Sequence, residues 1–218
     1  MTKKIEISSM NAMLYIDKFA FWRQSDTEKI PDVSFIPPML RRRMTNIEKI
    51  AISLAHTVAP ATPEYQIVFA SRFGEWQQTI DLIKQFYTDR EMSPAGFSNS
   101  VHNAAAGHLS LLTHNTQSYT SIAAGERTIE MGLLDAFTTK KPVLFIYVEE
   151  AAPTEYGHLF STPFMAHAVA CFISNTGENA YEFMKNNTNV EPLDFTKLCE
   201  SLTNKTDIKT SHWTLVKK

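Results

Sequence analysis

Short apolar runs recur along this chain of 218 residues and limit the folds that it can adopt. Residues 143–148, Val-Leu-Phe-Ile-Tyr-Val, form the most strand-like segment, because β-branched and aromatic residues favour strands. Residues 66–71 lack the polar alternation of a strand with one solvated face. They fit a strand buried on both faces, as in parallel sheets covered by helices. A third run, at 168–173, predicts a further strand.

Segments with helical periodicity lie between these runs. The first opens with a capping box, in which Thr45 and Glu48 each bond a free main-chain N–H of the first turn. Its apolar residues recur at helical spacing until Pro60 ends the pattern. Three more helices are predicted over 76–86, 100–112 and 129–137. Strands that alternate with helices of this length indicate an α/β layered domain.

The length of the chain allows one sizeable hydrophobic core. Residues 4–8 alternate polar and apolar side chains, which predicts a half-buried strand. Beyond residue 175 the chain becomes polar, and we expect a loop, one short helix and a terminal strand at 213–216 there. The prediction is therefore a domain over 1–175 and an extension over 176–218 that packs on the same domain.

Charge and hydropathy exclude two classes of partner. A net charge of −2 leaves no surplus of Lys and Arg to neutralise phosphates, so nucleic acid is not expected to bind. No window reaches the roughly eighteen consecutive apolar residues of a membrane span, and no apolar targeting segment follows the start Met-Thr-Lys-Lys. We expect a soluble, cytoplasmic protein without a membrane partner.

The histidines and cysteines do not have the spacing of metal or cofactor sites. His102, His108 and His114 are six residues apart, so they cannot share one helix face. For His108, on an apolar stripe, a hydrogen-bonded core position is favoured. Cys171 and Cys199 show no paired motif, so both are expected to be reduced and structural. We predict no metal and no cofactor.

The common catalytic motifs are absent: there is no GxSxG elbow, no P-loop and no dinucleotide fingerprint. Ser121 stands at a predicted junction of strand and helix, where a nucleophile could lie above the free amides of a helix. No base can be identified for it, and a serine in this position is usually a helix cap. The cap interpretation is favoured.

Two segments carry a resemblance to a known family. Residues 93–109 read SPAGFSNSVHNAAAGHL, and residues 120–125 read TSIAAG. In the ketosynthase branch of the thiolase-like superfamily, a motif like S-P-x-x-x-P-x-x-V-x-N-x-x-A-G-H-L precedes a short strand and the nucleophile motif T-A-C-[AS]-S-G. Most of residues 40–175 resemble this family in order. The resemblance implies an α/β fold, the N-terminal half of a thiolase-like fold, with a mixed sheet of roughly five strands covered by helices.

The departures from the family pattern bear on catalysis. Ile122 occupies the position of the nucleophilic cysteine, and an alkyl side chain cannot form a thioester. We also expect the chain to lack the C-terminal half that supplies two catalytic histidines in this family. Glu126, Arg127 and Glu130 stand where the family has small or neutral residues, so these charges need partners or solvent if the helix is buried. The resemblance therefore implies a protein that is not an enzyme.

The resemblance also implies a partner. Ketosynthase-like chains without a nucleophile are similar to chain-length factors, which form heterodimers with an active, full-length β-ketoacyl synthase in polyketide and fatty-acid-like synthesis. The short length is similar to that of chain-length-factor-like proteins of aryl polyene pathways in Gram-negative bacteria. An acyl carrier protein would dock mainly on the active partner. In such dimers the strand at 118–121 pairs across the two-fold axis, and the loop at Gly96 and Phe97 lends a side chain to the partner's acyl tunnel.

These implications define a set of tunnel and interface residues. Phe97 is a candidate tunnel wall or stop, with an ordinary core aromatic as an equal alternative. Two other functions stay open: an acyl-thioester enzyme that uses a hydroxyl nucleophile, and a homodimeric acyl-binding scaffold. The predicted residues are Gly96, Phe97, Asn103, Ser118, Tyr119, Thr120, Ser121 and Ile122.

Overall fold

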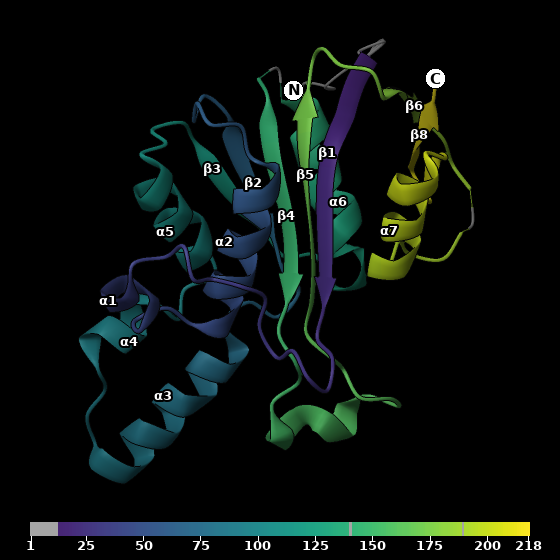
Figure 1. Cartoon of the computed structure of the whole chain (residues 1–218). Helices are drawn as coiled ribbons and strands as arrows, with labels where there is room; N and C mark the ends of the chain where they lie inside the picture. The colour runs from purple at the N-terminus through teal and green to yellow at the C-terminus, as the bar shows by residue number, and fades with distance from the viewer. Residues whose placement is uncertain (1–12, 140, 189) are drawn as a thin grey trace, which may run out of the picture.

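A computed structural model describes residues 13–139, 141–188 and 190–218. These residues form one mixed sheet with helices on both faces (Figure 1). The strand order is β3-β2-β4-β5-β1-β6-β8-β7. The strands are β1 (Met13–Arg23), β2 (Gln66–Ala70), β3 (Tyr119–Ile122), β4 (Val143–Glu149), β5 (His167–Ser174), β6 (Ala180–Lys185), β7 (Ile208–Lys209) and β8 (Trp213–Lys217).

The three apolar runs lie side by side at the centre of the sheet, as their composition predicts. Every residue of β4 is buried, since β4 lies between β2 and β5 and is covered on both faces. β2 pairs with β3 and β4 in parallel, whereas β5 pairs with β4 antiparallel. The prediction of a mixed α/β sheet is confirmed.

The strand count was predicted too low, because the sheet has eight strands among the described residues instead of roughly five. The strands that the sequence did not reveal are β1, β6 and β7. β1 has an irregular pattern of burial, and its pairing with β5 shifts register between Ile16 and Lys18, where Asp17 accepts main-chain N–H groups from Glu178 and Asn179. The bulge breaks the period of two by which strands are predicted. The strand predicted over residues 4–8 lies outside the described residues.

The helices form a layer on each face of the sheet, and two of them project beyond one end of it. α2 and α5 cover one face of the sheet, α6 and α7 cover the other, and α3 and α4 lie beyond the end of β2 (Figure 1). None of the helices in the described ranges is long and apolar enough to cross a membrane. The helices are α1 (Pro38–Arg41), α2 (Asn46–Val58), α3 (Trp76–Asp89), α4 (Pro94–Ser98), α5 (Ala104–Thr113), α6 (Thr128–Thr138) and α7 (Phe195–Asn204), with short 3₁₀ turns η1 (Gly125–Arg127) and η2 (Thr154–Leu159).

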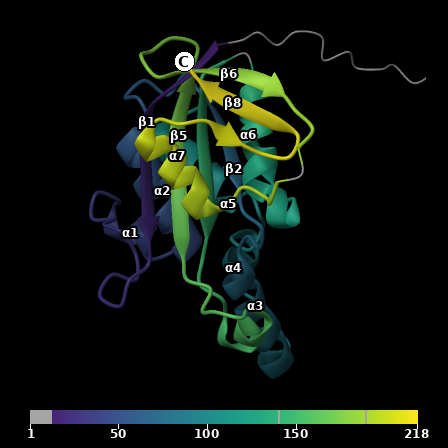
Figure 2. The ribbon, with the colours of Figure 1, turned by 90° about the vertical axis from the view of Figure 1, so that its right-hand side faces the viewer.

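The segment after residue 175 contributes β6, α7, β7 and β8 to this same sheet and core. Figure 2 shows this segment in front, with the sheet seen along its edge, α2 on the left and α6 on the right. The ring of Trp213 lies 5.8 Å from that of Phe137 on α6, in edge-to-face contact. α6 is thus enclosed between the sheet and this segment. The cysteines Cys171 and Cys199 are both free and buried in this layer.

Buried polar groups fix the start of α2. The predicted capping box is present, and the carboxylate of Glu48 also accepts a hydrogen bond from His108 Nδ1 at 2.9 Å. The hydrogen bond predicted for His108 is confirmed, but its ring is only partly buried, so the predicted core position is not. The hydroxyl of Thr45 donates to Glu75 Oε1 at 2.9 Å, whereas Glu75 Oε2 is buried without a partner among the described residues. Burial, and secondly the neighbouring Glu48, raise the pKa of Glu75 to about 9.

Glu75 should make folding pH-dependent. Its ordinary pKa is 4.5, so between pH 4.5 and 9 the folded state holds a proton that the unfolded state has lost, and stability falls as pH rises. Glu75→Gln mimics the protonated carboxyl and removes this decline. From pH 5 to pH 8 the variant should gain at least about 1 kcal/mol relative to the wild type, since a pKa difference of one corresponds to ~1.4 kcal/mol.

Urea unfolding at pH 5, 6.5 and 8 measures this effect. The exposed Glu64 provides the matched control, and Glu64→Gln should follow the wild-type pH dependence. Parallel curves for Glu75→Gln and the wild type would show that Glu75 does not bind a proton on folding.

Candidate functional site

Strand β3 lies at the edge of the sheet, and no other described strand pairs with its outer side. The carbonyl of Ser118 accepts from Ile67 N at 3.2 Å, and that of Ile122 accepts from Ser71 N at 3.1 Å. Because bonded residues alternate along a parallel ladder, the main-chain groups of Tyr119 and Ser121 face away from β2. They present an unpaired edge to which another strand can add.

A groove of about 650 Å³ runs beside this edge, between β3 and α5. Asn103 and Tyr119 meet in it, since the amide of Asn103 donates to Tyr119 Oη at 3.4 Å. Val101 and Leu111 also line the groove, and Leu111 is 74% exposed. The lining contains no Asp, Glu, Lys or Arg. The lining does include His108, whose pKa is raised by its hydrogen bond with Glu48. The structure therefore places the outer edge of β3 beside a groove with few charged side chains.

Gly96 and Phe97 lie on α4 and not in the groove itself. Gly96 packs against α3, where an added Cβ would lie 3.0 Å from Gln78 Nε2. The side chain of Phe97 is 57% exposed, so the alternative that it is a core aromatic is wrong. α4 still reaches the groove, because Ser98 and the following Asn99 line it.

The predicted junction at Ser121 is wrong in one respect. β3 continues through Ile122, and α6 begins only at Thr128, after the turn η1. Gly125 has a φ of 59°, in the left-handed region, which interrupts the passage from strand to helix. Ser121 is therefore a strand residue and not a helix cap. Its Oγ is buried without a hydrogen-bond partner in the described part of the chain.

The three unusual charges near α6 are resolved in different ways. Glu126 is exposed, whereas Arg127 donates to Ser211 Oγ at 2.9 Å and to His212 Nε2 at 2.6 Å. Glu130 is fully buried, and its Oε1 accepts from the main-chain N–H of residue 193 at 2.9 Å. The C-terminal segment thus supplies partners for Arg127 and for one carboxylate oxygen of Glu130, whose Oε2 is buried without a hydrogen-bond partner among the described residues.

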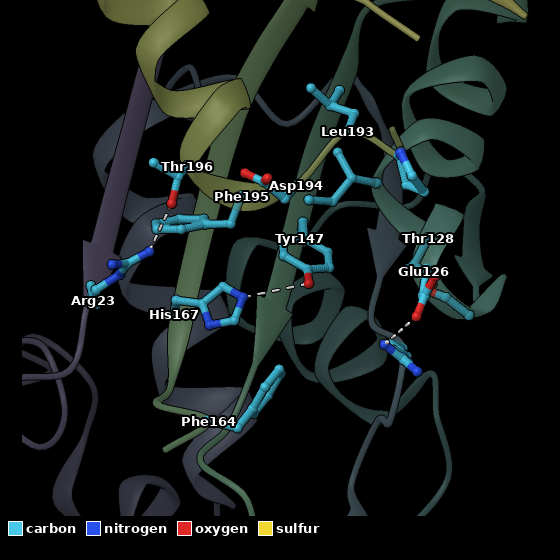
Figure 3. Close-up of a pocket in the computed structure, with 14 residues that line it drawn as sticks. Arg23, Glu126, Thr128, Tyr147, Phe164, His167, Leu193, Asp194, Phe195 and Thr196 are labelled. Carbon is cyan, nitrogen blue, oxygen red and sulfur yellow. Dashed lines mark hydrogen bonds and ion pairs between the residues drawn. The ribbon is translucent and has the colours of Figure 1, made fainter. Parts of the chain in front are cut away.

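A second cavity, of about 400 Å³, opens where α6 begins, at the ends of β4 and β5 (Figure 3). Residues 192–196 of the C-terminal segment form one wall. Its other side chains include Tyr147, Phe164, His167, Arg23 and Arg72. The sequence did not predict this cavity. Its residues share no motif, and those of β4 and β5 meet only because the two strands pair antiparallel.

The floor of this cavity is polar but uncharged. His167 Nδ1 donates to Met165 O at 2.8 Å, and Nε2 lies 3.5 Å from Tyr147 Oη. Burial lowers the pKa of His167, so its ring is neutral at pH 7. Burial, together with the nearby Glu149, raises the pKa of Tyr147, so its hydroxyl stays protonated. Within the described residues, no group of three His, Cys, Asp or Glu side chains is placed to hold a metal ion.

Comparison with solved structures establishes the fold. The chain is similar to a chain in the complex of a ketosynthase (ApeO) with its chain length factor (ApeC) from Xenorhabdus doucetiae. The TM-score is 0.74 and the sequence identity is 21%, and the match covers 94% of this chain and 99% of the chain in that complex. It is also similar to a chain of the ishigamide ketosynthase/chain length factor, with a TM-score of 0.53 and 15% identity over 66% of this chain and 49% of that one. It spans about half the length of that second chain.

A third similar structure is that of AntDE:AntF, a type II polyketide acyl-carrier protein in complex with its ketosynthase, with a TM-score of 0.64 and 13% identity over 82% of this chain and 70% of that one. No curated protein matches the chain. The family model described as "Beta-ketoacyl synthase, N-terminal domain" matches residues 19–217. The match covers nearly the whole chain, which therefore belongs to the family of β-ketoacyl synthase N-terminal domains.

Proposed function

We propose that this chain is a non-catalytic, chain-length-factor-like subunit that pairs with an active β-ketoacyl synthase and shapes the tunnel for its growing acyl or polyene chain. The proposal rests on the motif resemblance, by which Ile122 stands where the family has its nucleophilic cysteine. An alkyl group can neither ionise nor form a thioester. We infer that such a chain acts together with another subunit that supplies the nucleophile.

The alternative of a hydroxyl nucleophile has little support from the site. Ser121 Oγ is the nearest hydroxyl to the nucleophile position in sequence, and it is buried without a hydrogen-bond partner among the described residues. A serine needs a neighbouring base to become nucleophilic. Its strand position also removes the helix amides that the sequence had suggested, because α6 begins six residues after Ile122.

The surface around β3 supports the proposed pairing. The main-chain groups of Tyr119 and Ser121 can extend the sheet into a partner, and the adjoining groove offers Val101 and Leu111 as apolar contacts. Interface cores are depleted of charged residues, as this groove is. A second copy of the chain could use the same edge, which is the homodimeric scaffold alternative.

The solved structures named above support the identity of the partner. Two of them are ketosynthase–chain length factor assemblies, and the third holds an acyl-carrier protein with its ketosynthase. By this likeness the partner is a full-length ketosynthase that retains its cysteine and histidines, and the carrier protein docks mainly on that partner. Aryl polyene synthesis is the proposed pathway class.

Leu111→Asp tests the interface. A carboxylate at this exposed position would be desolvated against the partner, so affinity for the ketosynthase should fall at least about tenfold, or ~1.4 kcal/mol. Leu159→Asp is the matched control, because Leu159 is 65% exposed on η2, away from β3. Biolayer interferometry with the immobilised cognate ketosynthase gives both affinities. Wild-type affinity in Leu111→Asp, or equal losses in both variants, would contradict the proposed interface.

Phe97→Ala tests the tunnel. If the exposed ring of Phe97 limits the partner's tunnel, its removal should shift the product distribution of the reconstituted pair to longer chains, while total condensation stays within about twofold. Phe86→Ala removes another exposed ring, 43% exposed on α3, and should leave product length unchanged. Liquid chromatography with mass spectrometry resolves the products. An unchanged distribution in Phe97→Ala would remove Phe97 from the tunnel wall.

A further inference from the structure

A cavity of about 310 Å³ lies on the α2 side of the sheet, where β1 and β4 end and β5 begins. Three polar side chains line it from different elements: Gln24 follows β1, Asn46 opens α2, and Glu150 follows β4. The volume is at the lower end of the usual ~300–1,000 Å³ of small-molecule sites, so the cavity suits a ligand of few atoms. The apolar part of the lining is aliphatic, without an aromatic ring, and consists of Ile30, Ile50, Ala151, Ala152, Pro153 and Ala166.

Glu150 supplies the negative charge of this lining. It is 6% exposed, and its Oε1 accepts from Gln77 N at 3.0 Å. No lysine, arginine or histidine of the described chain lies within 4 Å of its carboxylate. Burial raises the pKa of Glu150 to about 7, although the N–H of Gln77 lowers it in part. A buried carboxylate without a cation is costly, and a bound cation would relieve that cost.

Lys29 supplies the positive charge, from the segment that follows β1. It is exposed, and among the described residues no carboxylate lies within 4 Å of its Nζ. The Oε1 of Gln24 accepts from Ala166 N at 3.2 Å, which holds this amide in place, and an amide NH₂ group can donate two hydrogen bonds. The cavity thus has one carboxylate and one ammonium group that are not paired with each other.

We propose that this cavity binds a small zwitterion of the aliphatic amino-acid class, with its ammonium group on Glu150 and its carboxylate on Lys29. The NH₂ group of Gln24 gives the ligand carboxylate a second donor, and Ile30 and Ile50 contact the aliphatic side chain. Hydrogen bonds between ionised groups are the strong ones. A ligand with only one of the two charges would leave either Glu150 or Lys29 without a partner.

The site uses neither β3 nor the groove beside it, because none of its lining residues lies there. The inference therefore goes beyond the pairing with a ketosynthase and does not depend on it.

Isothermal titration calorimetry of the full chain, alone and with its ketosynthase, tests the site. The probes are L-valine, isobutylamine, which lacks the carboxylate of valine, and isovalerate, which lacks its ammonium group. Valine should bind at least about tenfold more tightly than either analogue, because only valine pairs with both charges. Absence of valine binding, or equal affinity for valine and one analogue, would overturn the proposal.

The variant Glu150→Gln keeps an acceptor for Gln77 N but removes the charge, so its affinity for valine should fall at least about tenfold. Lys29→Gln should lower this affinity at least about fivefold, and valine should then bind no better than isobutylamine. Lys18→Gln is the matched control, because Lys18 is an exposed lysine outside the cavity, and it should bind valine as the wild type does.

Circular dichroism checks that each variant is folded. If Glu150→Gln is not folded, Lys29→Gln and the two analogues on the wild type decide. Wild-type affinity for valine in a folded Glu150→Gln or Lys29→Gln variant would contradict the proposed site.

Discussion

Strand β4 is buried along its whole length, and the burial of its two faces determines the arrangement of the rest of the chain. One face is covered by α2 and α5, and the other by α6, which itself lies beneath the C-terminal segment. The contact of Phe137 with Trp213 and the bond from the main chain of residue 193 to Glu130 hold that segment in place. Burying an unpaired charge is costly, so Glu130 and Arg127 near the start of α6 need the hydrogen-bond partners that residues 190–215 supply.

Among the described strands, β3 and the two-residue β7 form the two ends of the sheet, and the outer side of β3 has no strand partner. The groove beside β3 adds exposed apolar contacts and has no Asp, Glu, Lys or Arg in its lining, which suits pairing with another chain. The cover of α6 also creates the second cavity, because residues 192–196 close over the ends of β4 and β5. The edge and the cavity therefore lie on different parts of the fold and need not share a ligand or partner.

The parts of this fold that local patterns encode could be predicted, and those that depend on distant pairing could not. Continuous apolar runs revealed β2, β4 and β5, and the capping box revealed the start of α2. β1 stayed hidden because the bulge at Asp17 breaks its period, and its partners on β5 lie more than 140 residues away in sequence. The helix predicted over 129–137 matches α6, but Gly125 and the turn η1 separate this helix from β3, so the junction expected at Ser121 was wrong. The edge position of β3 was expected from the family resemblance. The contact between Tyr147 and His167 could not be predicted, because it depends on how β4 and β5 align in the sheet.

We propose that this chain contributes no covalent chemistry but is needed by a partner that does. Intact-mass spectrometry of the reconstituted pair, sampled during turnover with acyl-loaded carrier protein, measures both parts at once. The account predicts an acyl adduct on the ketosynthase cysteine, none on this chain, and loss of condensation when this chain is omitted. An acyl adduct on this chain, or undiminished condensation without it, would contradict the account.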